Sequence, residues 1–254
     1  YKAWNNNYLA IDRANQVISG IQKSANSSNA EMQQILGEAY CLRAYRYFLL
    51  CNFWGDVPYF SDPALYGHEL DKPKTDKNII YTQCIQDLVD CEGNMKWSDT
   101  NTGGIERMNR DFALGMISRL ALFRAGYGMT KEGTMKKADD YLTTSSDSLT
   151  VTYTDINGTK QTASTSADYY KLAKNYCQKL IQLKPRPLRS DFAQIFKDEC
   201  QYKVTNNDEV LYEVAYVESF GGDVGWCIGV PNTNALTKGN TTAQVFFSPT
   251  YYMS

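Results

Sequence analysis

Apolar residues recur at the three- and four-residue spacing of an α-helix in five separate windows of this chain. The windows predict helices over residues 4–20, about 29–53, about 76–95, 110–125 and about 167–183. Residues that stop a helix follow several windows, such as Gly55 with Pro58 after the second and Gly126 after the fourth. The pattern therefore predicts a mainly α-helical protein in which helices pack as antiparallel pairs.

Residues that cap helix N-termini precede three of the windows. Ser28 and Glu31 have the spacing of a capping box before the second helix. Thr75 or Asp76 is expected to cap the third helix, and Asn109 the fourth. These signals favour helices that begin at defined residues.

A few segments outside the helices have strand or turn character. Residues 149–153 and 159–163 flank Asn157-Gly158, which predicts a small hairpin with a tight turn. Residues 210–217 alternate and are rich in Val and Tyr, so they predict a strand, whereas 191–197 is read as a short amphipathic turn. We therefore expect long irregular loops and little β-structure.

Composition narrows the classes of protein that fit. The chain has 254 residues, which allows one large domain or two small ones, and apolar residues make up 43% of it. Lys and Arg number 26 against 28 Asp and Glu, so the basic excess typical of nucleic-acid binding is missing. No stretch approaches the roughly 18 apolar residues that a membrane-spanning helix needs.

The cysteine pattern argues against a metal centre. Seven cysteines are scattered without a CxxC pair, at positions 41, 51, 84, 91, 177, 200 and 227. The single histidine, His68, has no cysteine near it in the sequence, so we expect neither a metal nor a cofactor. Free, buried thiols are the expected state.

Several segments together resemble the SusD/RagB family of outer-membrane nutrient-binding lipoproteins. Residues 4–15 carry a Trp-x3-Tyr-x2-Ile-x3-Asn pattern. The most specific signature is residues 37–48, closely followed by Phe-Trp-Gly-Asp-Val-Pro at 53–58. Further matching segments, in the family's order, lie at 73–88, 109–123, 169–181, 192–196 and 209–215.

The resemblance implies a single SusD-like domain, an array of tetratricopeptide-like helix pairs carrying an irregular ligand-binding region. We expect helical repeats at about 1–126 and 167–197, with irregular ligand-side insertions at 127–166 and 198–247. We also expect a truncated chain, since the family's N-terminal lipoprotein segment and its C-terminal part have no counterpart here.

The same resemblance implies a non-catalytic function. Family members bind oligosaccharides or related nutrients at the cell surface and pass them to a SusC-like TonB-dependent outer-membrane transporter. Attachment to the membrane would come only from a lipid anchor that residues 1–254 do not contain. A helical-repeat scaffold for a protein ligand and a carbohydrate-active enzyme remain as alternatives.

Little in the sequence favours an enzyme. Asp56 could serve a glycosidase, but beside Gly and Pro it is better read as an acceptor for local backbone amides. His68 is the only possible imidazole base, and no serine elbow, P-loop or HExxH motif is present.

Arg43 lies on a core helix, so we expect it to be buried and paired, with Glu38 as one candidate partner.

Sugar binding needs an aromatic face for the ring and planar polar groups for its hydroxyls, both presented by loops. The family's signature motifs form the scaffold, so no binding residue is carried over from them. The candidates come from three loops and are Tyr66 and His68, Trp97 and Asn101, and Trp226. We predict that Trp97 or Trp226 is a solvent-facing platform.

Overall fold

The computed structural model describes residues 2–63, 71–142, 150–201, 203, 209–214, 230–233 and 242–245. The helices in this part of the chain are α1 Lys2–Gln22, α2 Ala30–Trp54, α3 Lys77–Cys91, α4 Arg110–Ala125, α5 Ser166–Leu183 and α6 Phe192–Cys200. Short 3-10 helices occur at η1 Glu92–Asn94, η2 Gly104–Glu106 and η3 Ala138–Asp140. The predicted mainly α-helical class is confirmed.

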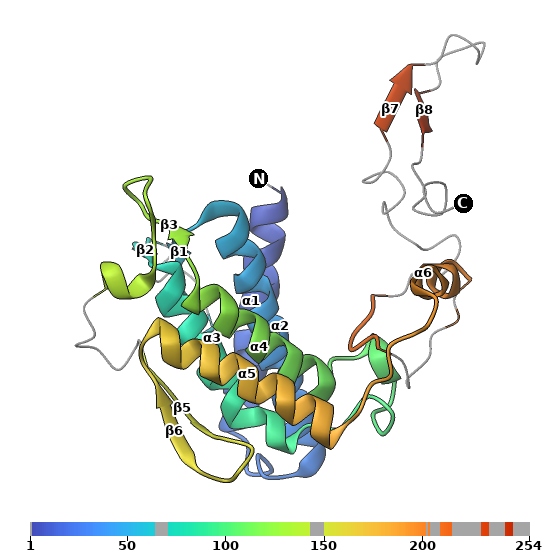
Figure 1. Cartoon of the computed structure of the whole chain (residues 1–254), viewed down its shortest axis with the longest axis horizontal. Helices are drawn as coiled ribbons and strands as arrows, with labels where there is room; N and C mark the ends of the chain where they lie inside the picture. Colours follow the sequence, from blue (N-terminus) through green and yellow to red (C-terminus); the bar gives the residue numbers. More distant parts are fainter. Residues whose placement is uncertain are drawn as a thin grey trace.

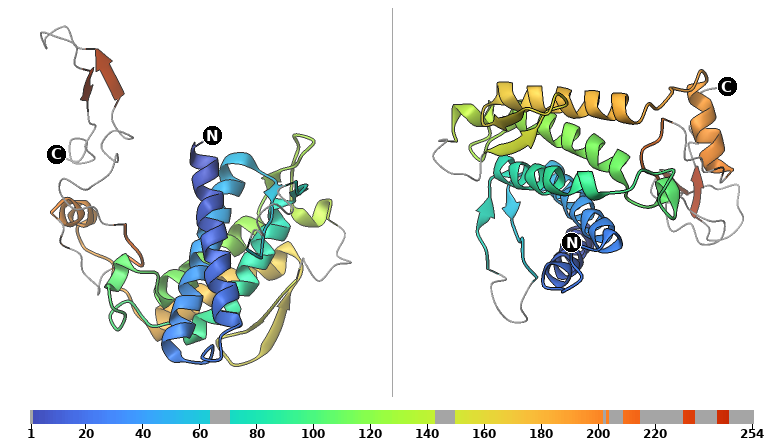
Figure 2. Two further views of the ribbon diagram at one scale, coloured as in Figure 1. Left: turned by 180° about the vertical axis from the view of Figure 1, so that it is seen from behind. Right: turned by 90° about the horizontal axis from the view of Figure 1, so that it is seen from below.

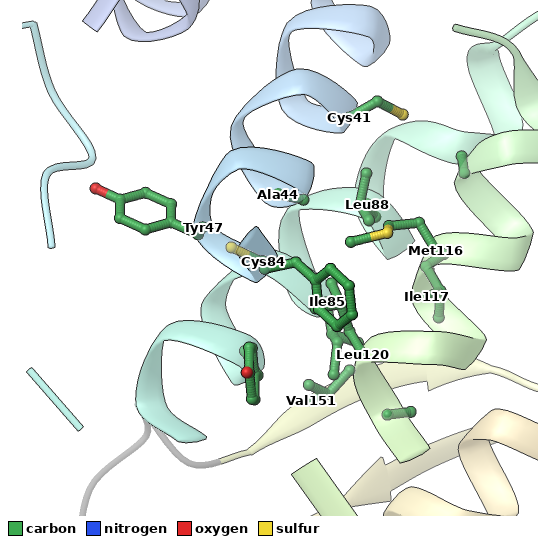
Figure 3. Close-up of a cluster of buried hydrophobic side chains, with 14 of the residues drawn as sticks. Cys41, Ala44, Tyr47, Cys84, Ile85, Leu88, Met116, Ile117, Leu120 and Val151 are labelled. Carbon is green, nitrogen blue, oxygen red and sulfur yellow. The ribbon is translucent and has the colours of Figure 1, made fainter. Parts of the chain in front are cut away.

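The first five helices form an array in which each packs against the next in the chain. Figure 2 shows them in chain order from α1 to α5 when the molecule is seen from below. A large apolar cluster lies between α2, α3, α4 and α5. In Figure 3 the labelled side chains of this cluster come from neighbouring helices, Tyr47 of α2, Cys84 of α3 and Ile117 of α4 among them, and from the strand that contains Val151.

Short two-stranded ribbons make up the β-structure of the described residues. The pairs are β1 Val57–Pro58 with β2 Lys74–Thr75, β3 Gly128–Met129 with β4 Met135–Lys136, β5 Val151–Thr154 with β6 Lys160–Ala163, and β7 Val230–Thr233 with β8 Thr242–Val245. The hairpin around Asn157-Gly158 is confirmed, with Val151 opposite Ala163 and Gly158 at φ 82°. The other three pairs were not predicted.

The strand predicted over residues 210–217 is wrong for residues 210–214, and the rest of it lies outside the described residues. The backbone of this segment is bound to a loop instead. The Asn109 side-chain amide donates to the carbonyl of Leu211, and the N–H of Glu213 donates to the carbonyl of Ile105. These bonds replace those of a strand ladder.

The starts of the five predicted helices agree closely with the sequence, with one correction. Of residues 191–197, read as a short amphipathic turn, 192–197 instead belong to the helix α6. Asn109 caps α4 as predicted, and of the two candidates for α3, Thr75 and Asp76, the cap is Asp76. For α2 the cap is Asn29 instead of Ser28, because the Asn29 side chain accepts the N–H of Glu31. The third helix ends at Cys91 and continues only as η1, so the predicted end at residue 95 was too late.

The thiols follow the expectation except at one position. Cys41, Cys51, Cys84 and Cys91 are free and buried, whereas Cys177 is free but exposed. Cys177 lies on α5, and its side chain points away from the core. The side chains of the remaining two cysteines lie outside the described residues, and the division into repeats and insertions stays a prediction.

Candidate functional site

Three of the five predicted ligand residues, Tyr66, His68 and Trp226, lie outside the described residues. Trp97 is half-buried and packs against the core, with the Arg110 guanidinium 4.7 Å from its ring centroid. Asn101 is buried, and its amide donates to the carbonyl of Met108 at 3.4 Å. The structure brings Trp97 and Asn101 together in one loop, and their part in binding stays a prediction.

Ion pairs bind this loop to the segment that follows α5. Lys184 pairs with Asp99, and this hydrogen bond holds the pKa of the Asp99 carboxyl below its usual value. Arg186 pairs at 2.7 Å with Asp111, which is fully buried, and also contacts Ser98. The loop around Trp97 is therefore fixed on its inner side by charge pairs.

A cleft with the chemistry of a sugar site lies elsewhere, beside α1. We call it the α1 cleft; its volume is about 430 Å³. Its lining residues come from α1 and from the segment after α2 and are Trp4, Asn5, Tyr8, Ile11, Asp12, Asn15, Pro58, Phe60 and Asp62. The volume falls in the range of small-molecule sites, and rings alternate with carboxylate and amide groups along its wall.

The opening pattern of the sequence forms one wall of the α1 cleft. Trp4, Tyr8, Ile11 and Asn15 follow one another at three- or four-residue intervals, so they share a face of α1. The ring centroids of Trp4 and Tyr8 lie 4.9 Å apart, and that of Phe60 lies 5.9 Å from Tyr8. The result is a continuous aromatic surface inside the cleft.

The opposite wall is held in place by side chains that bind its backbone. The Tyr8 hydroxyl donates to the carbonyl of Pro58 at 2.8 Å. The Asn15 amide donates to the carbonyls of Phe60 and Asp62 at 3.0 and 3.1 Å. Residues 59–62 lie in no helix or strand, so the bonds from Asn15 satisfy carbonyls that no helix or sheet would.

Arg43 continues this network below the cleft. It is 3% exposed, and its guanidinium donates to the side-chain oxygen of Asn15, the carbonyl of Ser61 and the carboxylate of Asp87. Burial alone would lower the pKa of Arg43, but the Asp87 carboxylate at 2.6 Å raises it above its usual value. The expected buried and paired state is confirmed.

The suggested partner of Arg43 was wrong. Glu38 pairs with Arg107 at 2.7 Å instead, while Asp87 approaches Arg43 from the neighbouring helix. Residues separated by five positions do not lie on the same helix face, which explains why Glu38 serves another cation.

Two further residues of the signature segment complete the frame. The Tyr47 hydroxyl accepts the N–H of Phe60 at 2.7 Å and donates to its carbonyl, and burial raises the pKa of Tyr47. Asp56 accepts the N–H of Lys77 at the start of α3, at 3.1 Å. Asp56 is therefore a backbone acceptor, but the interpretation that it binds local amides was wrong, because the amide lies 21 positions further along the chain.

Sequence reasoning placed the binding residues in loops and missed the α1 cleft. Its lining residues on the first helix were assigned to the scaffold, because residues 4–15 form a signature motif, whereas Phe60 and Asp62 lie in a loop that the sequence reading did consider. The available signal was the alternation of Trp4, Tyr8 and Asn15 with the polar residues Asn5 and Asp12 on the first helix.

Among the residues that the structure describes, no three His, Cys, Asp or Glu side chains gather as metal ligands would. None of the described helices has the length and apolar character needed to cross a bilayer.

Comparison with known proteins finds one matching family model and several similar proteins. Residues 1–122 match the family model SusD-like_3, described as "Starch-binding associating with outer membrane". SusD-like protein P38 of Formosa agariphila is 32% identical over 96 residues, which are 37% of this chain and 18% of that protein.

Solved structures show the same fold over most of the chain. A SusD homolog from Bacteroides thetaiotaomicron aligns with a TM-score of 0.62 at 16% identity, covering 85% of this chain and 35% of that one. A protein crystallised with a xylogluco-oligosaccharide aligns with a TM-score of 0.57 at 20% identity, covering 86% and 36%.

The matched parts are well under half of each relative's length. Activity, ligands and partners of those proteins therefore come from chains much longer than the segment shared with this one. The family model over residues 1–122, the related sequences and the shared helical fold together support the resemblance to the SusD/RagB family.

Proposed function

We propose that this chain binds an oligosaccharide and that the α1 cleft holds one of its sugar rings. The observation that carries the proposal is the cleft itself, in which the rings of Trp4, Tyr8 and Phe60 lie among Asn5, Asp12 and Asp62. A pyranose ring has a flat C–H face that packs on an aromatic ring. Its hydroxyls require planar acceptors and donors at the rim, which carboxylates and amides supply.

The frame behind the cleft suits binding without a large rearrangement. The bonds from Tyr8, Asn15, Arg43 and Tyr47 fix residues 58–62 before any ligand arrives. A preformed wall lowers the entropy that is lost on association. Weak binding, in the millimolar-to-micromolar range, is still expected because few groups contact the sugar.

We further propose that the protein is non-catalytic and acts at the cell surface. The description of the family joins starch binding to the outer membrane, which supports a lipid-anchored location and delivery of the glycan to a SusC-like TonB-dependent transporter. The fold shared with the protein crystallised with a xylogluco-oligosaccharide supports the same ligand class.

Isothermal titration of purified protein with xylogluco- and malto-oligosaccharides tests the site. Trp4→Ala is expected to weaken binding about tenfold, as the loss of one stacking platform would. Trp4→Phe should retain most of the affinity, and Trp97→Ala is the matched control in the loop favoured by the sequence. If Trp97→Ala abolishes binding while folded Trp4→Ala binds normally, the α1 cleft is not the site.

Release of reducing sugar tests the non-catalytic assignment. The protein should produce no reducing ends from any polysaccharide that it binds. The two carboxylates in the cleft are the relevant controls, since a glycosidase needs such a pair. Saturable hydrolysis that disappears in Asp12→Asn or Asp62→Asn protein would show that the chain is an enzyme.

A further inference from the structure

A second and larger cavity lies at the end of the bundle where β1, β2 and β3 gather (Figure 1). We call it the β3 cavity; its volume is about 630 Å³. Its wall combines the end of α2, the start of α3 and the end of α4 with the β3–β4 ribbon. The lining residues are Cys51, Asn52, Trp54, Gly55, Asp56, Lys74, Lys77, Tyr81, Phe123, Tyr127, Gly128, Met129, Thr130, Lys131 and Met135.

Three of the rings in the β3 cavity are accessible to solvent. Trp54, Phe123 and Tyr127 are 42%, 47% and 67% exposed. Phe123 and Tyr127 lie close together in the sequence around the end of α4, and the fold brings Trp54 to them from the distant end of α2. Exposed rings on a concave surface offer stacking faces to a planar or ring-shaped ligand.

The cavity also carries an excess of positive charge. Lys74, Lys77 and Lys131 line it, against the single carboxylate of Asp56. Asp56 already accepts the N–H of Lys77, and Lys131 lies 3.7 Å from the exposed carboxylate of Glu132. Among the lysines that line the cavity, Lys74 and Lys77 are therefore available to a ligand, and Lys137 lies nearby with its Nζ 5.2 Å from the centroid of the Tyr127 ring. The whole chain nevertheless carries a net charge of −2.

The position of Lys77 is set by the neighbouring ribbon. Its ammonium donates to the carbonyl of Met129 at 2.5 Å. A Cβ added to Gly128 would lie 2.9 Å from the Lys77 Nζ, so the glycine leaves the space that the ammonium occupies. An ammonium has three N–H donors, and one bond to a carbonyl leaves others for a ligand.

We propose that the β3 cavity is a second saccharide site, specific for a sugar that carries an acidic group. The ring would lie on the aromatic surface of Phe123 and Tyr127, and its carboxylate or sulfate would meet Lys74 and Lys77. This inference rests on the proposed function, because it assumes that the protein captures glycans. It adds a charge preference that the α1 cleft, which is lined by Asp12 and Asp62, would not provide.

Titration with three classes of oligosaccharide tests the proposal. The probes are an oligogalacturonate, a sulfated galacto-oligosaccharide and a neutral xylogluco-oligosaccharide. At least one acidic probe should bind, and Lys74→Gln should weaken that binding on the order of fivefold at low ionic strength. The effect should largely disappear at about 0.5 M salt. Binding of only one acidic probe identifies the acidic group and supports the site.

Matched variants distinguish the effect of the cavity lysines on affinity from the effects of the aromatic rings and of the protein's overall charge. Lys160→Gln removes an exposed lysine of β6 that does not line the cavity, and it should leave the affinity unchanged. Tyr127→Ala should weaken the acidic probe about as much as Lys74→Gln does. Trp54 is left intact because its ring also contacts Trp4 of the α1 cleft, at 5.4 Å.

The outcomes distinguish this proposal from the proposed function. If no acidic probe binds, or if Lys74→Gln and Lys160→Gln behave alike, the β3 cavity is not an acidic-sugar site. Neutral binding that still depends on Trp4 would then leave the α1 cleft in place. Conversely, acidic binding that depends on Lys74, with neutral binding indifferent to Trp4, supports the β3 cavity and overturns the α1 cleft.

Discussion

Replacing Arg43 with Met should reduce the free energy of unfolding substantially. Arg43 bonds Asp87, Asn15 and Ser61, and the change leaves all three acceptors without their donor. Breaking a buried ion pair from one side typically costs about 3–5 kcal/mol. The Asp87 side chain is 23% exposed and so keeps some water, which places the expected loss near the lower end, at about 3 kcal/mol.

Urea unfolding followed by far-UV circular dichroism measures this loss. Arg13→Met is the control, because Arg13 is an exposed arginine of α1, and a change within about 0.5 kcal/mol is expected there. The double variant Arg43→Met/Asp87→Leu should lose less than the sum of the two single variants, since no buried charge is left behind. A loss below about 1 kcal/mol for Arg43→Met would refute the reasoning.

Three further predictions concern packing, pH and thiol reactivity. Gly37→Ala should lower the free energy of unfolding in urea by about 1–3 kcal/mol, because the added Cβ would lie 2.5 Å from Met95. Gly20→Ala is the control: its added Cβ meets nothing within 4 Å, so it should stabilise α1 by up to about 1 kcal/mol. Equal effects of the two changes would refute the packing argument. The hydrogen bond from the side chain of Thr165 lowers the pKa of Asp168. The ionised carboxylate therefore stabilises the folded protein above the usual carboxyl pKa, and this stability is lost as the pH falls through the lowered pKa. The melting temperature of Asp168→Asn protein should change less between about pH 5 and pH 3 than that of the parent. Maleimide labelling read by mass spectrometry should modify Cys177 in the native protein and the four buried thiols, whose pKa values burial raises, only after denaturation.

The helices could be predicted because their signals are local. The spacing of apolar residues and the caps at Asn109 and Asp76 act within a few positions, and α4 begins and ends where the sequence indicated. Where two residues could cap, local signals were not decisive: Ser28 and Asn29 are both good N-caps, and geometry selected Asn29. The residue at which a helix begins depends on which side chain bonds the free backbone N–H groups, and a sequence pattern does not determine this.

The partners of buried charges and the site itself could not be predicted, because they depend on contacts between distant segments. Asp87 meets Arg43 across 44 positions of the chain, and no helical spacing links them. The β1–β2 ribbon is two residues long on each side, too short for any alternation to show. A cleft is likewise a property of how segments meet, and only the types of residue available to it can be read from the sequence.

The α1 cleft suggests why signature residues and ligand contacts need not be separate sets. Tyr8 and Asn15 bind the backbone of residues 58–62 and also line the cleft, so one set of side chains both builds the wall and lines the proposed site. Asn5 and Asp62 line the same cleft and are exposed, so they can change without loss of the frame. Specificity within the family would then vary through such rim positions, while the tyrosine and asparagine that bind the wall keep its shape.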